Sequence, residues 1–161
     1  MLAALTAFHV LISLVGILTG FMVVAGFVRG RKQAGLTQWF FATTFLTSAT
    51  GFLFPFHSVT PGIVVGILSL IVLGLGVLTW NRRATGRPWS RTFVLSSVIA
   101  LYLNVFVLIA QLFMKVPALK ALAPTQSEPP FAIAQLAVLL TFIGLGVLAV
   151  KGQRKVTPLA V

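Results

Sequence analysis

The feature that most constrains this chain is a series of five apolar runs, each long enough to cross a lipid bilayer as a helix. They occupy residues 2–28, 36–54, 61–80, 92–114 and 131–150, and none of them contains Lys, Arg, Asp or Glu. A hydrocarbon core about 30 Å thick is spanned by roughly 20 helical residues. The sequence therefore predicts an all-α membrane protein: a bundle of five transmembrane helices that forms a single integral membrane domain over 1–161.

The composition excludes a soluble globular domain and several kinds of chemistry. The chain is 58% hydrophobic and 8% charged, whereas soluble domains are about 25% charged. The 12 Lys plus Arg against 1 Asp plus Glu would indicate nucleic-acid binding in a soluble protein. Here the cations flank apolar runs, so no nucleic-acid partner is predicted. The absence of Cys excludes disulfides, thiolate nucleophiles and cysteine-bound metal centres.

The basic residues predict the orientation, because five spans place the two ends of the chain on opposite sides. Ten of the 12 fall on one side, namely Arg29, Arg31, Lys32, Arg82, Arg83, Arg87, Arg91, Lys151, Arg154 and Lys155. Only Lys115 and Lys120 fall on the other. The positive-inside rule then predicts the N-terminus outside and the C-terminus inside. Trp39, Trp80 and Trp89 lie near the inner ends of the spans, as expected of an aromatic belt.

The longest interruption between apolar runs is the loop 115–130, which this threading places outside. It holds the sole acidic side chain, Glu128. Pro117 is expected to start a short interfacial helix over 118–123, since proline is tolerated in a first helical turn. Ser127 is expected to be the N-cap of the fifth span, with Glu128 in the first turn, where an acid complements the helix dipole.

Neutral polar side chains gather in or near the outer halves of the spans. Amide and imidazole groups cost free energy in lipid, so they are expected to face the bundle interior or a wet cavity. The sequence predicts a polar pocket open to the outer face, lined by Ser13, Thr47, Thr50, Asn104, Gln111, Lys115, Glu128 and Gln135. The alternative is an interhelical hydrogen-bond cluster without a ligand, since helices in bundles commonly form such bonds.

The two histidines, His9 and His57, both belong to the outer side of this threading. They are candidate axial ligands of a haem b, and with Glu128 they form the ligand set of an open non-haem iron site. The opposing interpretation is an interfacial side chain for His9 and a solvated turn for His57, because nothing in their spacing requires them to meet.

Glycines recur four residues apart in the apolar runs, as the pairs Gly16 and Gly20, Gly26 and Gly30, and Gly62 and Gly66. Such pairs let helix backbones approach closely in lipid. They predict either packing within the bundle or oligomerisation through glycine-lined helix faces.

Three segments resemble those of a group of small proteobacterial multi-pass inner-membrane proteins with no assigned activity. They are FHVLISLVGILTG at 8–20, GFLFPF at 51–56 and FMKVPALKALAPTQSEPPF at 113–131. The similarity covers nearly the whole chain, and the third segment is specific. The resemblance implies a bacterial inner (cytoplasmic) membrane location and an outer loop of the same kind.

The chain carries no catalytic constellation and no soluble domain, so no reaction is indicated. This favours an accessory or interaction component that packs with other membrane proteins or with lipids. One alternative is an outer-leaflet ligand, haem or metal-binding protein that uses His9 and His57. Another is a small transporter through the same polar pocket. Transport driven by a carboxylate is disfavoured, because carriers bury the acid within the membrane and Glu128 lies outside the spans.

Overall fold

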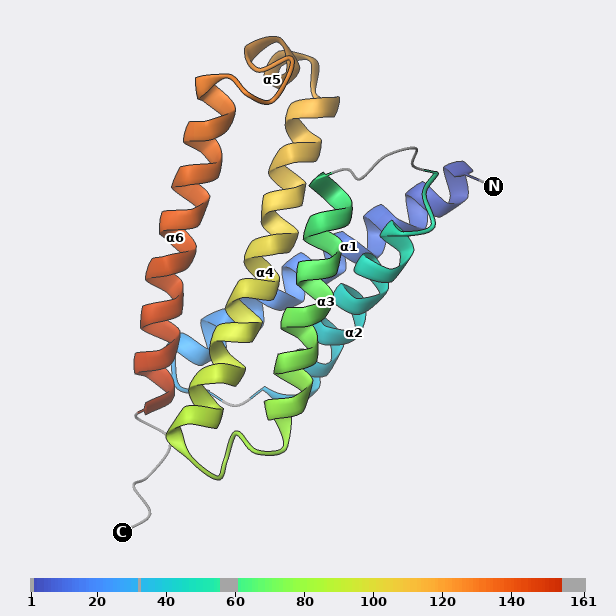
Figure 1. The fold of residues 1–161 in the computed structure, drawn as a ribbon. Coiled ribbons are helices and arrows are strands. Elements are labelled where there is room, and N and C mark those ends of the chain that lie inside the picture. Colours follow the sequence, from blue (N-terminus) through green and yellow to red (C-terminus); the bar gives the residue numbers. More distant parts are fainter. Residues whose placement is uncertain (1, 32, 56–60, 155–161) are drawn as a thin grey trace.

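The computed structural model describes residues 2–31, 33–55 and 61–154, which contain six α-helices and no strand (Figure 1). The helices are α1 Leu2–Val28, α2 Ala34–Gly51, α3 Pro61–Trp80, α4 Arg87–Lys115, α5 Pro117–Leu122 and α6 Pro129–Arg154. The predicted all-α class is confirmed. A helix covers most or all of each predicted span, and α5 matches the short helix predicted from Pro117 in the loop 115–130.

Two helices begin or end several residues away from the ends of their apolar runs. α4 begins at Arg87, five residues before its apolar run, because Pro88 suits a first helical turn and the backbone needs no apolar side chains to stay helical. α2 ends at Gly51 rather than at 54, since Pro55 disfavours helical geometry in the residue before it. Hydropathy thus marks the part of a helix that suits lipid, whereas prolines mark where it begins and ends.

Four of the helices, α1, α3, α4 and α6, are long and apolar enough to cross a membrane. α2 is not one of these four, although it is an 18-residue helix. Its sequence contains five threonines, a serine and a glutamine, which lower its hydropathy. The described part of the chain therefore has the composition of a multi-pass membrane protein with four candidate spans.

α4 is the central helix of the bundle. It packs against α1, α3 and α6, and Figure 1 shows it between α3 and α6, with the α1–α2 pair crossing at an angle behind. Over its most apolar segment 56% of α4 is buried, compared with 22% for both α3 and α6. α3 and α6 are therefore the peripheral helices, and their outward faces form much of the apolar surface.

The core joins α1, α2 and α4. Its most deeply buried large side chains are Val23 and Val24 of α1, Phe40 of α2, and Val94 and Leu101 of α4. An aromatic group continues this core towards the loop between α3 and α4. There Trp80 and Phe93 meet edge-on with ring centroids 5.5 Å apart, and Phe41 contacts both rings.

Glycines allow the closest approaches in this core. A Cβ atom on Gly20 would lie 2.6 Å from Cδ1 of Leu101 and 2.8 Å from Cε2 of Phe40. Gly16 and Gly66 also face neighbours within the chain, Thr43 and Phe52. These three glycines thus serve packing inside the bundle, which is one of the two roles that the glycine spacing predicts.

Candidate functional site

The polar side chains that enter the bundle form specific contacts between helices. Nδ1 of His9 on α1 lies 2.9 Å from Oγ1 of Thr50 on α2. The Thr50 hydroxyl donates to the carbonyl of Leu46 at 2.7 Å, so its oxygen accepts from His9 when the imidazole carries its proton on Nδ1. The His9 ring also contacts Phe54 edge-on at 5.3 Å. His9 is therefore held between α1 and the chain that ends α2.

A second contact joins α2 to α4 deeper in the bundle. Asn104 donates from Nδ2 to Oγ1 of Thr44 over 3.0 Å, and both side chains are buried. A buried amide without a partner costs free energy, so this pair favours one rotation of α4 against α2. The sequence predicts Asn104 as a pocket residue but gives no reason to pair it with Thr44 rather than with Thr43 or Thr47.

A third contact joins α6 to α4. Gln135 donates from Nε2 to the carbonyl of Phe106 over 3.1 Å. Its Oε1 atom is buried without a hydrogen-bond partner among the described residues, and the same holds for Oγ1 of Thr47. Buried polar atoms of this kind are where a water molecule or a ligand would supply the missing bond.

The other predicted pocket residues are placed separately. The Ser13 hydroxyl donates to the carbonyl of His9 in its own helix. Gln111 and Lys115 are exposed. His57 lies outside the described residues, so the haem b and metal sites stay predictions, and so does the pocket as a whole.

Glu128 lies in the loop between α5 and α6, where its own loop supplies the donors. Oε1 accepts from the N–H of Thr125 at 3.2 Å and from the Thr125 hydroxyl at 2.9 Å, and Oε2 accepts from the N–H of Ser127 at 3.1 Å. Desolvation raises the pKa of Glu128. Hydrogen bonds from its own backbone and from these groups lower the pKa by a larger amount, so it lies below its ordinary value. The carboxylate is thus stabilised in its charged form without a lysine.

The prediction that Ser127 is the N-cap of the last span is wrong. α6 begins at Pro129, so Glu128 precedes it, and the Glu128 carbonyl accepts from the N–H of Phe131 at 3.1 Å. The Ser127 hydroxyl bonds to the Thr125 hydroxyl instead. Because the first two residues of α6 are prolines without N–H groups, fewer donors at this helix end need a side-chain cap.

Gln126 is a structural residue that the sequence analysis missed. Its backbone has a positive φ of 62°, and its Nε2 donates to the carbonyl of Ala110 on α4 over 2.7 Å. The side chain therefore fastens the loop to the end of α4. A glutamine in a polar loop is usually solvated, so no signal in the sequence distinguishes this one.

A further contact missed by the sequence analysis joins the last turns of α1 and α6. Nε2 of Gln153 lies 3.5 Å from the carbonyl oxygens of Phe27 and Arg31. The last carbonyls of a helix have no partner within it; that of Phe27 accepts from the N–H of Gly30 at 3.1 Å, and Gln153 adds a contact from α6. Gly152 makes the approach feasible, because a Cβ atom there would overlap the carbonyl oxygens of Phe27 and Val28.

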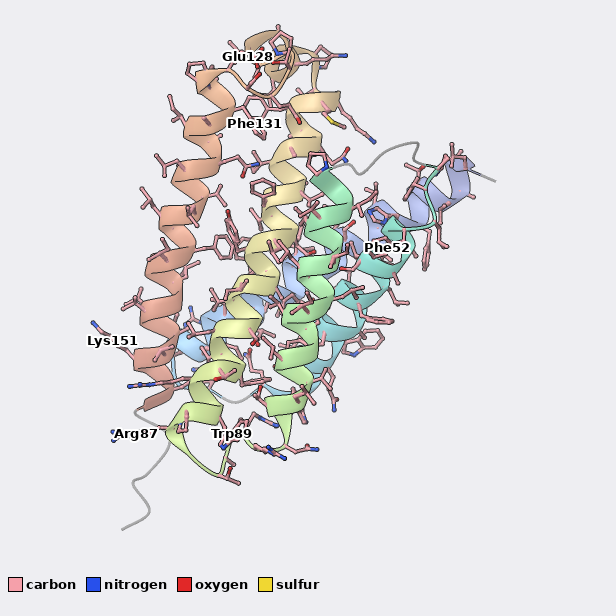
Figure 2. The ribbon with its side chains drawn as sticks, viewed as in Figure 1. Phe52, Arg87, Trp89, Glu128, Phe131 and Lys151 are labelled. Atoms are coloured by element: carbon pink, nitrogen blue, oxygen red, sulfur yellow. The ribbon has the colours of Figure 1, made fainter. Side chains whose placement is uncertain are left out.

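The opposite end of the bundle from Glu128 gathers cations and aromatic rings, and we refer to it as the basic end (Figure 2). Its described cations are Arg29, Arg31, Arg82, Arg83, Arg87, Arg91 and Lys151. The guanidinium carbon of Arg83 lies 3.9 Å from the ring centroid of Trp80 and 5.4 Å from that of Phe93. That of Arg82 lies 4.9 Å from the ring centroid of Trp89. The sequence predicts the tryptophans as an aromatic belt and the arginines as an orientation signal. The structure shows that Trp80 and Trp89 contact Arg83 and Arg82.

Comparison of the chain with protein-family models, with curated proteins and with solved structures finds no match.

Proposed function

We propose that this chain is an accessory or interaction component of a bacterial inner membrane, and that it acts by packing against another membrane protein rather than by catalysis. The observation that carries the proposal is the contrast between the inside and the outside of the bundle. Inside, His9, Asn104 and Gln135 make hydrogen bonds between helices or to backbone. Outside, α3 and α6 expose broad apolar faces.

The exposed face of α6 is the surface that we assign to a partner helix. Apart from its chain neighbours and the backbone of its own helix, Gly144 has no described atom within 4 Å of where a Cβ would lie. Leu140, Ile143 and Val147 beside it are exposed. A glycine flanked by large apolar side chains lets a second helix approach closely in lipid, whereas Gly16 and Gly20 already have neighbours within the chain.

The proposal includes five spans, with α2 as the fifth. α2 packs against α1 and α3, and its Thr37, Thr43, Thr44 and Ser48 are buried. Between 38 and 46 its exposed residues are Gln38, Trp39, Ala42, Phe45 and Leu46, of which only Gln38, in the second turn of the helix, is polar. A helix whose polar side chains face protein can lie in a bilayer at lower mean hydropathy, because only its lipid-facing side is solvated by hydrocarbon.

The proposed orientation has the N-terminus outside and the basic end in the cytoplasm, as the positive-inside rule requires. The absence of cysteine from the natural sequence makes a direct test simple. Single Ser127→Cys and Thr85→Cys variants are exposed to a membrane-impermeant maleimide on intact cells. We expect Ser127→Cys to be labelled and Thr85→Cys to be labelled only after permeabilisation. The reverse pattern would show that the threading is inverted.

The interaction role is tested by purification from native membranes in a mild detergent. We expect the chain to migrate with a larger assembly, and Gly144→Leu to weaken this association. Gly35→Leu is the matched control, since Gly35 also has open space beside it but lies on α2. A monodisperse monomer without partners, or equal loss in both variants, would contradict the assignment.

A second candidate is ligand binding in the outer leaflet, favoured by Oγ1 of Thr47 and Oε1 of Gln135, which have no hydrogen-bond partner within the described part of the chain. For haem, the Nδ1 contact of His9 with Thr50 is the kind of hydrogen bond that orients a ligating imidazole and leaves Nε2 for the metal. A Soret band that disappears in His9→Ala would support haem, and a colourless preparation would remove it. Uptake by proteoliposomes that is lost in Gln111→Leu would support transport.

A further inference from the structure

We propose that Arg82 and Arg83, held against Trp80 and Trp89 at the basic end, bind the phosphate group of an anionic phospholipid. This inference rests on the membrane location of the helices and not on the partner protein proposed above. It assigns to the basic end a lipid headgroup site in addition to a role in orientation.

The aromatic rings hold the two guanidinium groups in a definite way. Arg83 is half-buried between Trp80 and Phe93, with its guanidinium carbon 3.9 Å and 5.4 Å from the two ring centroids. Arg82 is exposed, 4.9 Å from Trp89. An arginine that contacts a ring through its planar face keeps the N–H groups at its edge available, and those groups match the oxygens of a phosphate.

Among the residues that the structure describes, no acidic side chain lies beside these cations. The only acidic side chain of the protein is Glu128, which lies at the opposite end of the bundle, and Figure 2 shows the separation of Glu128 from Arg87, Trp89 and Lys151. The Glu128 carboxylate is moreover occupied by Thr125 and Ser127. Most of the counter-charge of the basic end must therefore come from other molecules.

The position of the site selects a lipid as that molecule. Trp80 ends α3 and Trp89 lies in the first turn of α4, so both rings lie at ends of candidate spans, where tryptophan occupies the headgroup level. Arg83 is half-buried, so its guanidinium has lost part of its hydration, and this burial lowers its pKa. A charged group that has lost water gains most from a charged hydrogen-bonding partner. At this depth the available partner is a phosphodiester of the surrounding leaflet.

The test uses the purified full-length protein in nanodiscs that contain equal amounts of phosphatidylcholine and phosphatidylglycerol. Native mass spectrometry measures which lipid stays bound after release from the disc. We expect the wild-type protein to retain phosphatidylglycerol preferentially. One basic residue near an anionic surface changes affinity roughly fivefold. The double variant Arg82→Gln/Arg83→Gln is therefore expected to reduce the preference roughly 25-fold.

The matched control is Lys115→Gln/Lys120→Gln, which removes the same charge from the opposite end and is expected to keep the preference. An equal loss in both double variants would mean that net charge alone attracts the lipid, and would overturn the site. Equal retention of the two lipids by the wild-type protein would also overturn it, and would indicate an acidic partner protein or solvent at the basic end.

Arg83→Lys is a milder variant in case the double variant fails to fold. It preserves the positive charge and removes only the planar guanidinium group. We expect it to retain part of the preference and an unchanged circular dichroism spectrum. Full retention would contradict the role of the stacked guanidinium. No partner protein is present in the nanodisc. A negative result there would contradict the lipid site and would leave the proposed interaction with another membrane protein unaffected.

Discussion

At the end of the bundle that carries α5, a single carboxylate is surrounded by donors of its own loop, whereas at the basic end at least seven cations have no acidic side chain of the chain beside them. Glu128 accepts hydrogen bonds from Thr125 and Ser127. Arg82 and Arg83 contact aromatic rings instead. The difference teaches that the one carboxylate of this protein is stabilised by its own loop, whereas the cations of the basic end are stabilised within the chain only by contact with aromatic rings.

The largest effect is expected at Gly152, which joins the last turns of α1 and α6 at the basic end. A side chain at this position would overlap backbone carbonyl oxygens, so relief requires a movement of the helix. We expect Gly152→Val to lower the free energy of unfolding by about 3 kcal/mol, as overpacking does. Gly144→Val on the same helix meets open space and is expected to be nearly neutral in the purified protein. Unfolding in mixed detergent micelles measures both, and equal stability of the two variants would contradict the close approach.

At the other end, Gln126 combines a hydrogen bond to α4 with a positive φ. Gln126→Ala and Gln126→Gly both lose the hydrogen bond, but only glycine accepts the left-handed backbone without a steric cost. We expect the alanine variant to be less stable than the glycine variant by about 1 kcal/mol. The same unfolding measurement applies, and a more stable alanine variant would show that the loop adopts another conformation.

The contact between Asn104 and Thr44 lies between the two ends and provides a reference for the strength of a buried bond. We expect Asn104→Leu and Thr44→Val to be coupled by about 0.6 kcal/mol in a double-mutant cycle, the average for such bonds in membranes. Additive effects of the two substitutions would mean that the amide finds another partner when Thr44 is changed.

The smallest effect concerns pH. The pKa of Glu128 is lower in the folded protein than in the unfolded chain, so the carboxylate stabilises the fold above the unfolded value of about 4.3. This contribution is lost as the pH falls through the folded pKa. We expect a slight fall of the thermal midpoint in this acid range for the wild-type protein, and none for Glu128→Gln. A similar fall in Glu128→Gln would assign the acid sensitivity to another group.

The sequence predicted the helices well and their contacts poorly. Apolar runs and prolines predicted the positions of α1, α3 and α5 because hydropathy and missing N–H groups are local properties. The same local reasoning predicted Ser127 as the N-cap of the last helix, and this prediction was wrong. The two prolines that begin α6 have no backbone N–H group, so fewer donors at this helix end need a side-chain cap. Hydrogen bonds such as Gln126 to Ala110 were not predictable, since a glutamine in a loop has the same local signal whether it is solvated or bound.

The sequence by itself determined that the chain is helical, that most of its surface is apolar and that its cations and its one acid lie in different segments, because each of these follows from residues close together in the chain. Only the tertiary structure decided that Thr44 pairs with Asn104, that Gly152 meets the end of α1 and that Arg83 stacks on Trp80 and Phe93. Those contacts depend on the rotation and crossing of whole helices, and these are fixed by the sum of many packing interactions that no single segment contains.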